Sequence, residues 1–191
     1  MFVKICGITN FEDAWAAIDM GAQALGFIQA PASPRYIHPE QLQQWIARIP
    51  VNIWKVGVFV NESPAKIEWI STQLGLNIAQ LHGDETPAHH PQNLQIWRAF
   101  RVTPEAPPNR EYPADAILLD GPGGGKTFDW KICSTIARPL ILAGGLNQHN
   151  VREAIAETNP WGVDIASGIE SSPGRKDHLR MKQFIEAALS K

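Results

Sequence analysis

The sequence is poor in cysteine and has no long apolar run. Its 191 residues include two cysteines, Cys6 and Cys133, which lie far apart and outside any CxxC motif. They predict neither a disulfide framework nor a zinc knuckle, and this favours a reducing compartment. No apolar stretch reaches the ~18 residues of a membrane-spanning helix, and the first residues lack the pattern of a signal peptide. We therefore expect a cytoplasmic protein with no membrane partner.

An excess of positive charge is also missing. Lys and Arg number 17 against 19 Asp and Glu, the formal net charge is −2, and no Lys/Arg-rich run occurs. Because nucleic-acid binding relies on a positive field over the phosphate backbone, no nucleic-acid partner is expected. The chain does have 44% hydrophobic residues, including seven Trp. This content and the length predict a single domain, residues 1–191, with a sizeable core.

Short apolar runs recur along the whole chain at intervals of about twenty residues. Most are almost continuously apolar, which is typical of strands in a sheet that is covered on both faces. The eight predicted strands are 2–6, 24–28, 56–60, 77–81, 96–100, 116–119, 140–143 and 162–166.

The segments between these runs show the helical period instead. Apolar residues spaced i, i+3, i+4 and i+7 predict helices over 11–18, 42–49 and 181–188. The exception is 103–114, which holds four prolines and no apolar stripe, so a loop is expected there.

Eight strands alternating with helices predict a compact single-domain (β/α)8 TIM barrel, because an open doubly wound sheet commonly has only five or six strands. The chain is short for this fold, whose usual length is ~250 residues, so its loops must be minimal. In such barrels the functional residues follow the carboxyl ends of the strands. The residues at those positions are therefore the candidates for a site.

Glycine and serine follow the last two strands, as Gly144, Gly145, Ser167 and Gly168. Barrels often hold a phosphate at this place on backbone N–H groups. These four residues are the candidate phosphate site. The alternative is that the glycines only permit tight turns.

Four further side chains stand in strand-end positions, and each has a structural alternative. Cys6 could exchange a proton as a thiolate or be an inert core residue. Asp129, between two aromatic residues, could be a general acid with a raised pKa or a helix N-cap. Arg35 could clamp a carboxylate or be a solvated loop charge. His82 is a possible pocket residue. Cys133 is expected to be packed in the core.

Two other kinds of site are disfavoured. The loop 121–127 resembles a P-loop, but the GxxxxGK[ST] pattern requires glycine where Asp120 stands. No histidine pair has the spacing of metal ligands, so no metal is expected.

Seven motifs in chain order resemble those of the phosphoribosylanthranilate isomerase family. They are KICGIT at 4–9, SPR at 33–35, VGVF at 56–59, QLHG at 80–83, FDW at 128–130, AGGL at 143–146 and SGIE at 167–170. Together they span nearly the whole chain. That family is a compact barrel of about this size.

The resemblance implies an enzyme of tryptophan biosynthesis that needs no cofactor. It would convert N-(5-phosphoribosyl)anthranilate into 1-(2-carboxyphenylamino)-1-deoxyribulose 5-phosphate by an Amadori rearrangement. Asp129 would be the general acid that opens the sugar ring, and Cys6 the general base. Arg35 would hold the substrate carboxylate, and the loops at 144–145 and 167–168 its phosphate.

Other interpretations stay open at this point. A related barrel performs the same rearrangement on a histidine-pathway aminoaldose, but it carries two aspartates, and Cys6 speaks against it. A noncatalytic phosphate-binding barrel would bind the substrate without turnover. The expected partner is a phosphorylated small molecule, and the chain could be a monomer or a homodimer.

Overall fold

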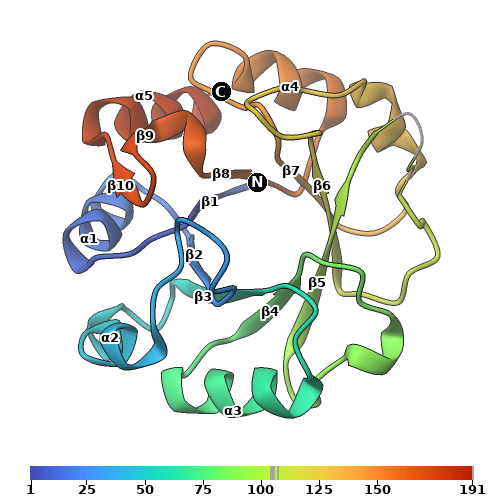
Figure 1. The fold of residues 1–191 in the computed structure, drawn as a ribbon. Coiled ribbons are helices and arrows are strands. Elements are labelled where there is room, and N and C mark those ends of the chain that lie inside the picture. Colours follow the sequence, from blue (N-terminus) through green and yellow to red (C-terminus); the bar gives the residue numbers. More distant parts are fainter. Residues whose placement is uncertain (104–105, 107, 191) are drawn as a thin grey trace.

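Eight parallel strands, hydrogen-bonded in sequence order, close into a barrel with helices and loops outside it (Figure 1). The computed structural model describes residues 1–103, 106 and 108–190. The strands are β1 (Phe2–Cys6), β2 (Ala24–Ile28), β3 (Trp54–Phe59), β4 (Ile78–Leu81), β5 (Gln95–Arg101), β6 (Ala116–Asp120), β7 (Leu140–Leu142) and β8 (Gly162–Ile165). The predicted (β/α)8 fold and all eight predicted strands are confirmed, with ends that differ by at most two residues.

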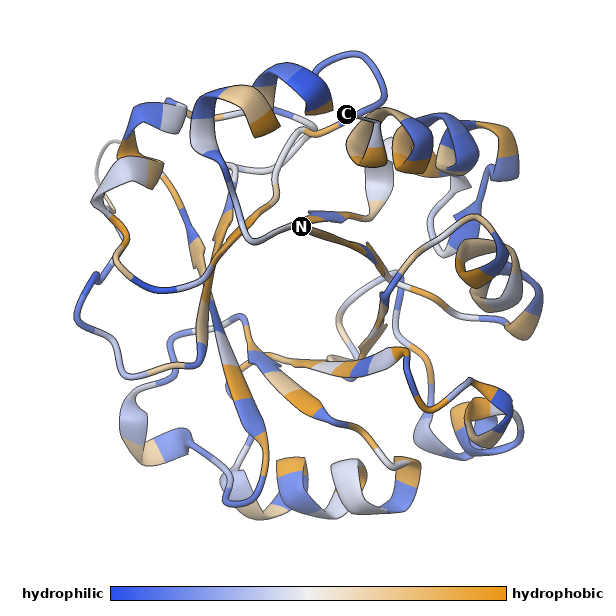
Figure 2. Cartoon of the chain, turned by 180° about the vertical axis from the view of Figure 1, so that it is seen from behind, coloured by the Kyte–Doolittle hydropathy of each residue, from blue (hydrophilic) through white to orange (hydrophobic). Residues whose placement is uncertain are grey.

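The helices cover the outside of the barrel with their apolar faces. They are α1 (Phe11–Asp19), α2 (Pro39–Gln43), α3 (Pro64–Leu74), α4 (Val151–Thr158) and α5 (His178–Leu189). In Figure 2 each carries both hydrophobic and hydrophilic segments, as expected for helices with one buried and one exposed face. Local caps fix their ends: the Asn10 side chain accepts the Asp13 N–H before α1, and Gly75 ends α3 in the left-handed conformation. Of the helices in the described ranges, none has the length and apolarity to cross a membrane.

The connection between β2 and β3 differs from the prediction of one helix over 42–49. The helix α2 ends at Gln43, and a separate 3-10 turn, η1 (Ile46–Arg48), follows. Trp45 leaves the helical conformation with φ −141°, and its ring packs edge-on against Phe11 and Phe27. Tertiary packing of this side chain therefore overrides the helical period. The apolar stripe is still buried on the barrel.

The predicted loop over 103–114 lies partly outside the described residues, which omit 104, 105 and 107. The described remainder of that segment contains no helix. Three further 3-10 turns complete the connections: η2 (Pro87–His89), η3 (Trp130–Thr135) and η4 (Ser167–Ile169). A short antiparallel hairpin that the sequence did not predict, β9 (Glu170–Ser172) with β10 (Arg175–Lys176), joins β8 to α5.

Side chains alternate along each strand between the barrel interior and the helices. On β1, Val3 and Ile5 belong to the large core between strands and helices, whereas Phe2 belongs to a second core inside the barrel. Lys4 and Cys6 share the inward face with Phe2 because they follow it at intervals of two. This alternation brings the Lys4 ammonium and the Cys6 thiol into the barrel interior.

Four aromatic rings gather at the amino-terminal end of the strands. They belong to Phe2, Trp54, Trp97 and Trp161, and their contacts have centroid separations from 4.8 to 5.9 Å. Trp97 is fully buried among them. This aromatic cluster occupies the amino-terminal end of the barrel interior.

Candidate active site

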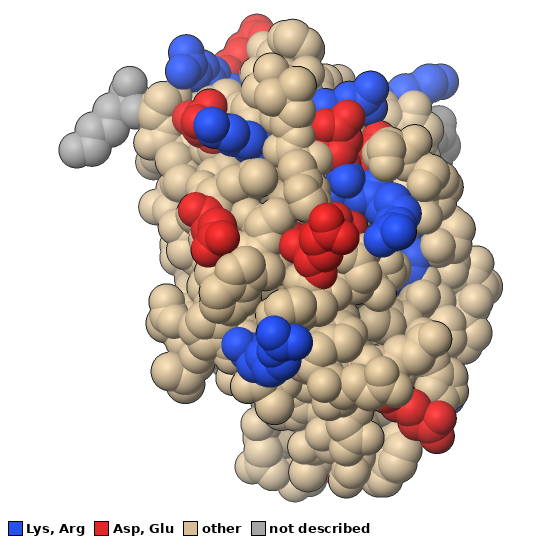
Figure 3. All heavy atoms as spheres, turned by 90° about the vertical axis from the view of Figure 1, so that its left-hand side faces the viewer, with Lys and Arg blue, Asp and Glu red and all other residues tan. Residues whose placement is uncertain are grey.

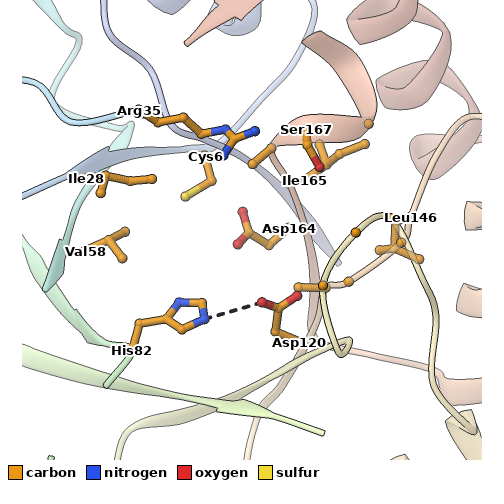
Figure 4. Close-up of a pocket in the computed structure, with 18 of the residues that line it drawn as sticks. Cys6, Ile28, Arg35, Val58, His82, Asp120, Leu146, Asp164, Ile165 and Ser167 are labelled. Carbon is orange, nitrogen blue, oxygen red and sulfur yellow. Dashed lines mark ion pairs between the residues drawn. The ribbon is translucent and has the colours of Figure 1, made fainter. Parts of the chain in front are cut away.

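A pocket of about 720 Å³ opens at the carboxyl-terminal ends of the strands (Figure 4). Its lining includes the last residues of four strands, Cys6 of β1, Ile28 of β2, Asp120 of β6 and Ile165 of β8. The side chains of Cys6, Asp164, His82 and Asp120 all point into the same space. The pocket therefore lies at the end of the barrel where the sequence placed the candidate residues.

The candidate phosphate residues Gly144, Gly145, Ser167 and Gly168 all line this pocket. Gly144 and Gly145 have φ values of +78° and +67°, which glycine adopts readily. Within the described residues, neither of these two glycines donates its backbone N–H to a protein acceptor. Asn150 Nδ2 holds the turn by donating to the Gly145 carbonyl at 2.9 Å. The turn that lines the pocket therefore contains two backbone donors without a protein acceptor.

The same glycines also allow two loops to interlock. A Cβ atom on Gly144 would lie 1.8 Å from the backbone nitrogen of Gly121, and one on Gly145 would lie 2.6 Å from that of Thr127. Tight packing therefore requires glycine at both positions. The two glycines therefore permit the close packing of the loops and also line the pocket, so the turn interpretation and the phosphate interpretation are compatible.

Cys6 is almost fully buried, with 6% of its surface exposed, and it borders the pocket. Burial raises the pKa of its thiol, against the effect of the neighbouring Lys4 ammonium, which lowers it. Lys4 is fully buried and pairs with Asp164 on β8, with 2.9 Å between Nζ and Oδ1. The thiol is therefore largely shielded from solvent and lies near the Lys4–Asp164 ion pair.

Arg35 borders the pocket, but its guanidinium is already paired within the protein. Its Nε and Nη2 donate to both carboxylate oxygens of Glu170 at 2.7 to 3.1 Å. Glu170 also accepts from the buried Lys176 Nζ at 2.9 Å. Although burial opposes it, the hydrogen bond from Arg35 and the charge of Lys176 hold the pKa of Glu170 below its ordinary value. Within the described residues, Nη1 of Arg35 makes no hydrogen bond, so these N–H groups remain for a ligand.

His82 and Asp120 face each other in the pocket, with 3.4 Å between Nε2 and Oδ2. The other ring nitrogen of His82, Nδ1, lies 3.1 Å from Gln80 Nε2. Because that amide nitrogen can only donate, Nδ1 acts as the acceptor and the ring proton lies on Nε2, toward Asp120. Asp120 ends strand β6, so its position at a strand end could be predicted from the sequence. Nevertheless, this residue was given no role on the basis of the sequence.

Asp129 lies elsewhere. It caps η3 by accepting the Lys131 N–H at 3.1 Å, and it borders a separate hollow of about 500 Å³ with Phe128 and Ile132. The residues lining the Cys6 pocket do not include it. The structure therefore does not bring the expected acid together with the expected base, and the N-cap alternative describes its position. Cys133 packs in the core, where burial raises its pKa to about 11.

Enzymes built on closed parallel barrels carry out their chemistry at this end of the strands, and by fold and pocket position the protein belongs to the (β/α)8 barrel enzymes. A family model described as N-(5'phosphoribosyl)anthranilate (PRA) isomerase matches residues 3–187. The chain belongs to this family and is an isomerase.

Relatives of known name cover the chain almost completely. N-(5'-phosphoribosyl)anthranilate isomerase of Solibacter usitatus is 46% identical over 98% of this chain and 97% of its own. Monomers generated from the dimeric enzyme of Thermotoga maritima are 40% identical and superpose with a TM-score of 0.87 over all of both chains. A phosphoribosylanthranilate isomerase in complex with reduced 1-(o-carboxyphenylamino)-1-deoxyribulose 5-phosphate is also 40% identical, with a TM-score of 0.87 over 98% of both chains.

Proposed function

We propose that this pocket converts N-(5-phosphoribosyl)anthranilate into 1-(2-carboxyphenylamino)-1-deoxyribulose 5-phosphate, a step of tryptophan biosynthesis. The observation that carries the proposal is one pocket that joins the Cys6 thiol, the Asp120 carboxyl and glycine loops with unpaired N–H groups, in a chain of this family. A relative that binds a reduced form of the product supports the choice of ligand.

The reaction needs an acid and a base on one sugar. Protonation of the furanose ring oxygen opens the ring to an iminium, which withdraws electrons and acidifies the neighbouring C–H. A base of modest strength then removes that proton to give an enolamine, which tautomerises to the ketone. Because the substrate supplies its own electron sink, we expect neither a metal nor an organic cofactor to take part.

Asp120, rather than Asp129, is proposed as the acid. Its carboxyl lies in the pocket, whereas Asp129 is occupied as the cap of η3 beside another hollow. His82 Nε2 lies 3.4 Å from the Asp120 carboxyl and is its nearest titratable neighbour in the pocket. The sequence interpretation chose Asp129 because a family motif contains it, whereas Asp120 is the carboxylate that lines the pocket together with Cys6.

Cys6 is proposed as the base, and Arg35 with the glycine loops as the binding groups. The phosphate accepts hydrogen bonds from the backbone N–H groups of Gly144, Gly145, Ser167 and Gly168. The anthranilate carboxylate accepts from Nη1 of Arg35, which Glu170 leaves available. Pairing with Glu170 keeps the guanidinium in one orientation, so less rotamer entropy is lost when the substrate binds.

The first test is turnover with a base-deficient control. N-(5-phosphoribosyl)anthranilate is generated in situ, and the loss of its fluorescence is followed with the purified protein and with Cys6→Ala. We expect loss that depends on Cys6. Tight binding of the reduced product without turnover would instead support the noncatalytic barrel, and no binding would reject the substrate.

A matched pair of variants decides the acid. We expect Asp120→Asn to lower kcat by about 10²- to 10⁴-fold, the usual contribution of a general acid. Asp129→Asn should keep kcat near that of the wild type, because asparagine is an equally good N-cap. The reverse result would restore Asp129 as the acid.

The remaining parts of the proposal concern partners and location. A phosphorylated small molecule is the partner, and two cysteines that form no disulfide fit the cytoplasm. Figure 3 shows acidic and basic side chains interspersed on the face it displays, and no nucleic-acid partner is proposed. The Thermotoga maritima relative is dimeric, so sedimentation must decide here between monomer and homodimer.

A further inference from the structure

Lys4 is a charged side chain that the proposed reaction does not use. It is fully buried, on the inward face of β1 between Phe2 of the aromatic cluster and Cys6 at the pocket. Its neighbour in the sheet register is Asp164 of β8, and the two side chains form an ion pair of 2.9 Å. A buried ion pair is a poor source of stability, because desolvation offsets the attraction. Its position next to the reacting end of the barrel therefore needs another reason.

The missing side chain of Gly26 brings Lys4 and Cys6 into one space. A Cβ atom built on Gly26 would lie 2.7 Å from Cys6 Sγ and 3.1 Å from Lys4 Cε. The sulfur and the end of the lysine stem therefore both lie over this glycine. Asp164, which holds the ammonium in place, itself lines the pocket (Figure 4).

The charged groups packed around Cys6 leave a positive surplus. Lys4 and Asp164 come from β1 and β8, Lys176 comes from β10, and Arg35 comes from the loop after β2. Glu170, paired with both Lys176 and Arg35, is the second anion. These five residues carry three cations and two anions, and Asp120 adds a third anion to the wider pocket. His82 and Asp120 face the pocket from β4 and β6.

We propose that Lys4 is a positioning residue for the base, its ammonium fixed by Asp164 so that positive charge stands beside the Cys6 sulfur when the thiolate forms in a site shielded from water. The inference rests on the proposed role of Cys6. Asp164 has two opposite effects in this arrangement, since it orients the lysine and also repels the thiolate.

The directions of the pKa shifts agree with the geometry. Burial raises the pKa of Cys6, the charge of Lys4 opposes this, and the charge of Asp164 adds to it. Burial works against the Lys4 ammonium, but Asp164 and Cys6 hold the pKa of Lys4 above its ordinary value. The ion pair with Asp164 therefore favours the charged form of the lysine beside the thiol.

The experiment measures the ionisation of the thiol without using turnover. The rate of alkylation of Cys6 by iodoacetamide is followed from pH 6 to 11 by mass spectrometry of the peptide that contains it, which separates it from Cys133. Lys4→Met removes the charge and keeps the length of the side chain. Asp164→Asn removes the opposite charge. Lys66→Met, at an exposed lysine of α3, is the matched control.

We expect opposite effects from the two pocket variants. Lys4→Met should shift the midpoint of the profile to higher pH and slow alkylation at pH 8 about tenfold, the change that one pKa unit produces in the thiolate fraction. Asp164→Asn should shift the midpoint to lower pH. The double variant should lie between the single ones, and Lys66→Met should match the wild type.

Equal profiles for wild type, Lys4→Met and Asp164→Asn would overturn the proposal, and so would shifts in the same direction. If Lys4→Met does not fold, Lys4→Gln, which also removes the charge, replaces it in the same comparison. The acidic limb of the kcat/KM profile should move with the alkylation midpoint. A shift in alkylation without a shift in that limb would keep the charge effect and reject Cys6 as the base.

Discussion

The two ends of the barrel differ in composition although the same strands build both. At the amino-terminal end, Phe2, Trp54, Trp97 and Trp161 exclude space, whereas the carboxyl end leaves a hollow of about 720 Å³ bordered by ionisable groups. The five residues of strand β1 run from the aromatic cluster at one end to the pocket at the other. Side chains two positions apart on one face are separated by only ~7 Å, so stabilising and reacting groups are neighbours.

This closeness has an energetic consequence. Burial of the aromatic rings stabilises the fold, since each ring removes a large apolar area from water. The carboxyl end costs stability, because charged side chains such as Lys4 and Glu170 are desolvated and only partly compensated by their partners. The comparison predicts that changes at one end alter stability and changes at the other alter catalysis.

The largest effect on stability is expected from Trp97→Ala. The ring is fully buried in the aromatic cluster, and its loss should lower the free energy of unfolding by about 3–5 kcal/mol. Urea unfolding followed by circular dichroism measures this loss. The kcat of the folded fraction should stay within about twofold of wild type, because Trp97 is not among the residues that line the pocket.

A control sharpens this prediction. The Trp97 indole N–H has no hydrogen-bond partner among the described residues, so Trp97→Phe removes an unsatisfied donor and keeps an aromatic ring. It should cost much less stability than the alanine variant. A parallel fall of stability and kcat in both variants would mean that the two ends are not independent.

An intermediate effect is expected from Arg35→Ala at the mouth of the pocket. Loss of a charged hydrogen bond to the substrate carboxylate, worth about 1.5–3 kcal/mol, should raise KM roughly 10- to 100-fold. Steady-state kinetics should show a smaller change in kcat. Arg35→Lys keeps the charge but loses the planar guanidinium, so its KM should lie between those of the wild type and Arg35→Ala. An unchanged KM would place the carboxylate elsewhere.

The smallest effect is a change in the pH dependence of stability in Glu170→Gln. Because Arg35 and Lys176 hold the pKa of Glu170 below its unfolded value of about 4.3, its charge stabilises the fold above that pH. The contribution is lost as the pH falls toward the folded pKa. The stability difference between wild type and variant should therefore narrow from pH 5 to pH 3 in urea titrations. A difference that stays constant would contradict the pairing.

Much of the fold could be predicted from the sequence because barrel strands are apolar on both faces and evenly spaced. The helix over 42–49 was wrong because the packing of Trp45 decided the backbone there. The hairpin β9–β10 was missed because its strands are polar and short, and its position depends on Lys176 and Glu170 meeting inside the fold.

The site was predicted in part, for a reason that lies in the chain itself. Residues at strand ends, such as Cys6 and Gly144, can be found from position alone. The position of Asp120 in the pocket was not predicted, because the sequence interpretation favoured a motif nine residues further on, and spacing along the chain does not show into which hollow a carboxylate points. Lys4 and Asp164 lie inside strands. In the sequence each is a charged residue within an apolar run, and this was the only indication of a special role.

The hydrogen bond from Lys176 Nζ to the carbonyl of Cys6, 2.7 Å long, joins positions 170 residues apart. During synthesis on the ribosome, Cys6 is made early and Lys176 late. Until β8 and the hairpin emerge, β1 has one unpaired edge and its cysteine lacks the cations from the far end of the sequence. The surroundings of Cys6 are therefore completed only when the hairpin has been made and has docked against β1.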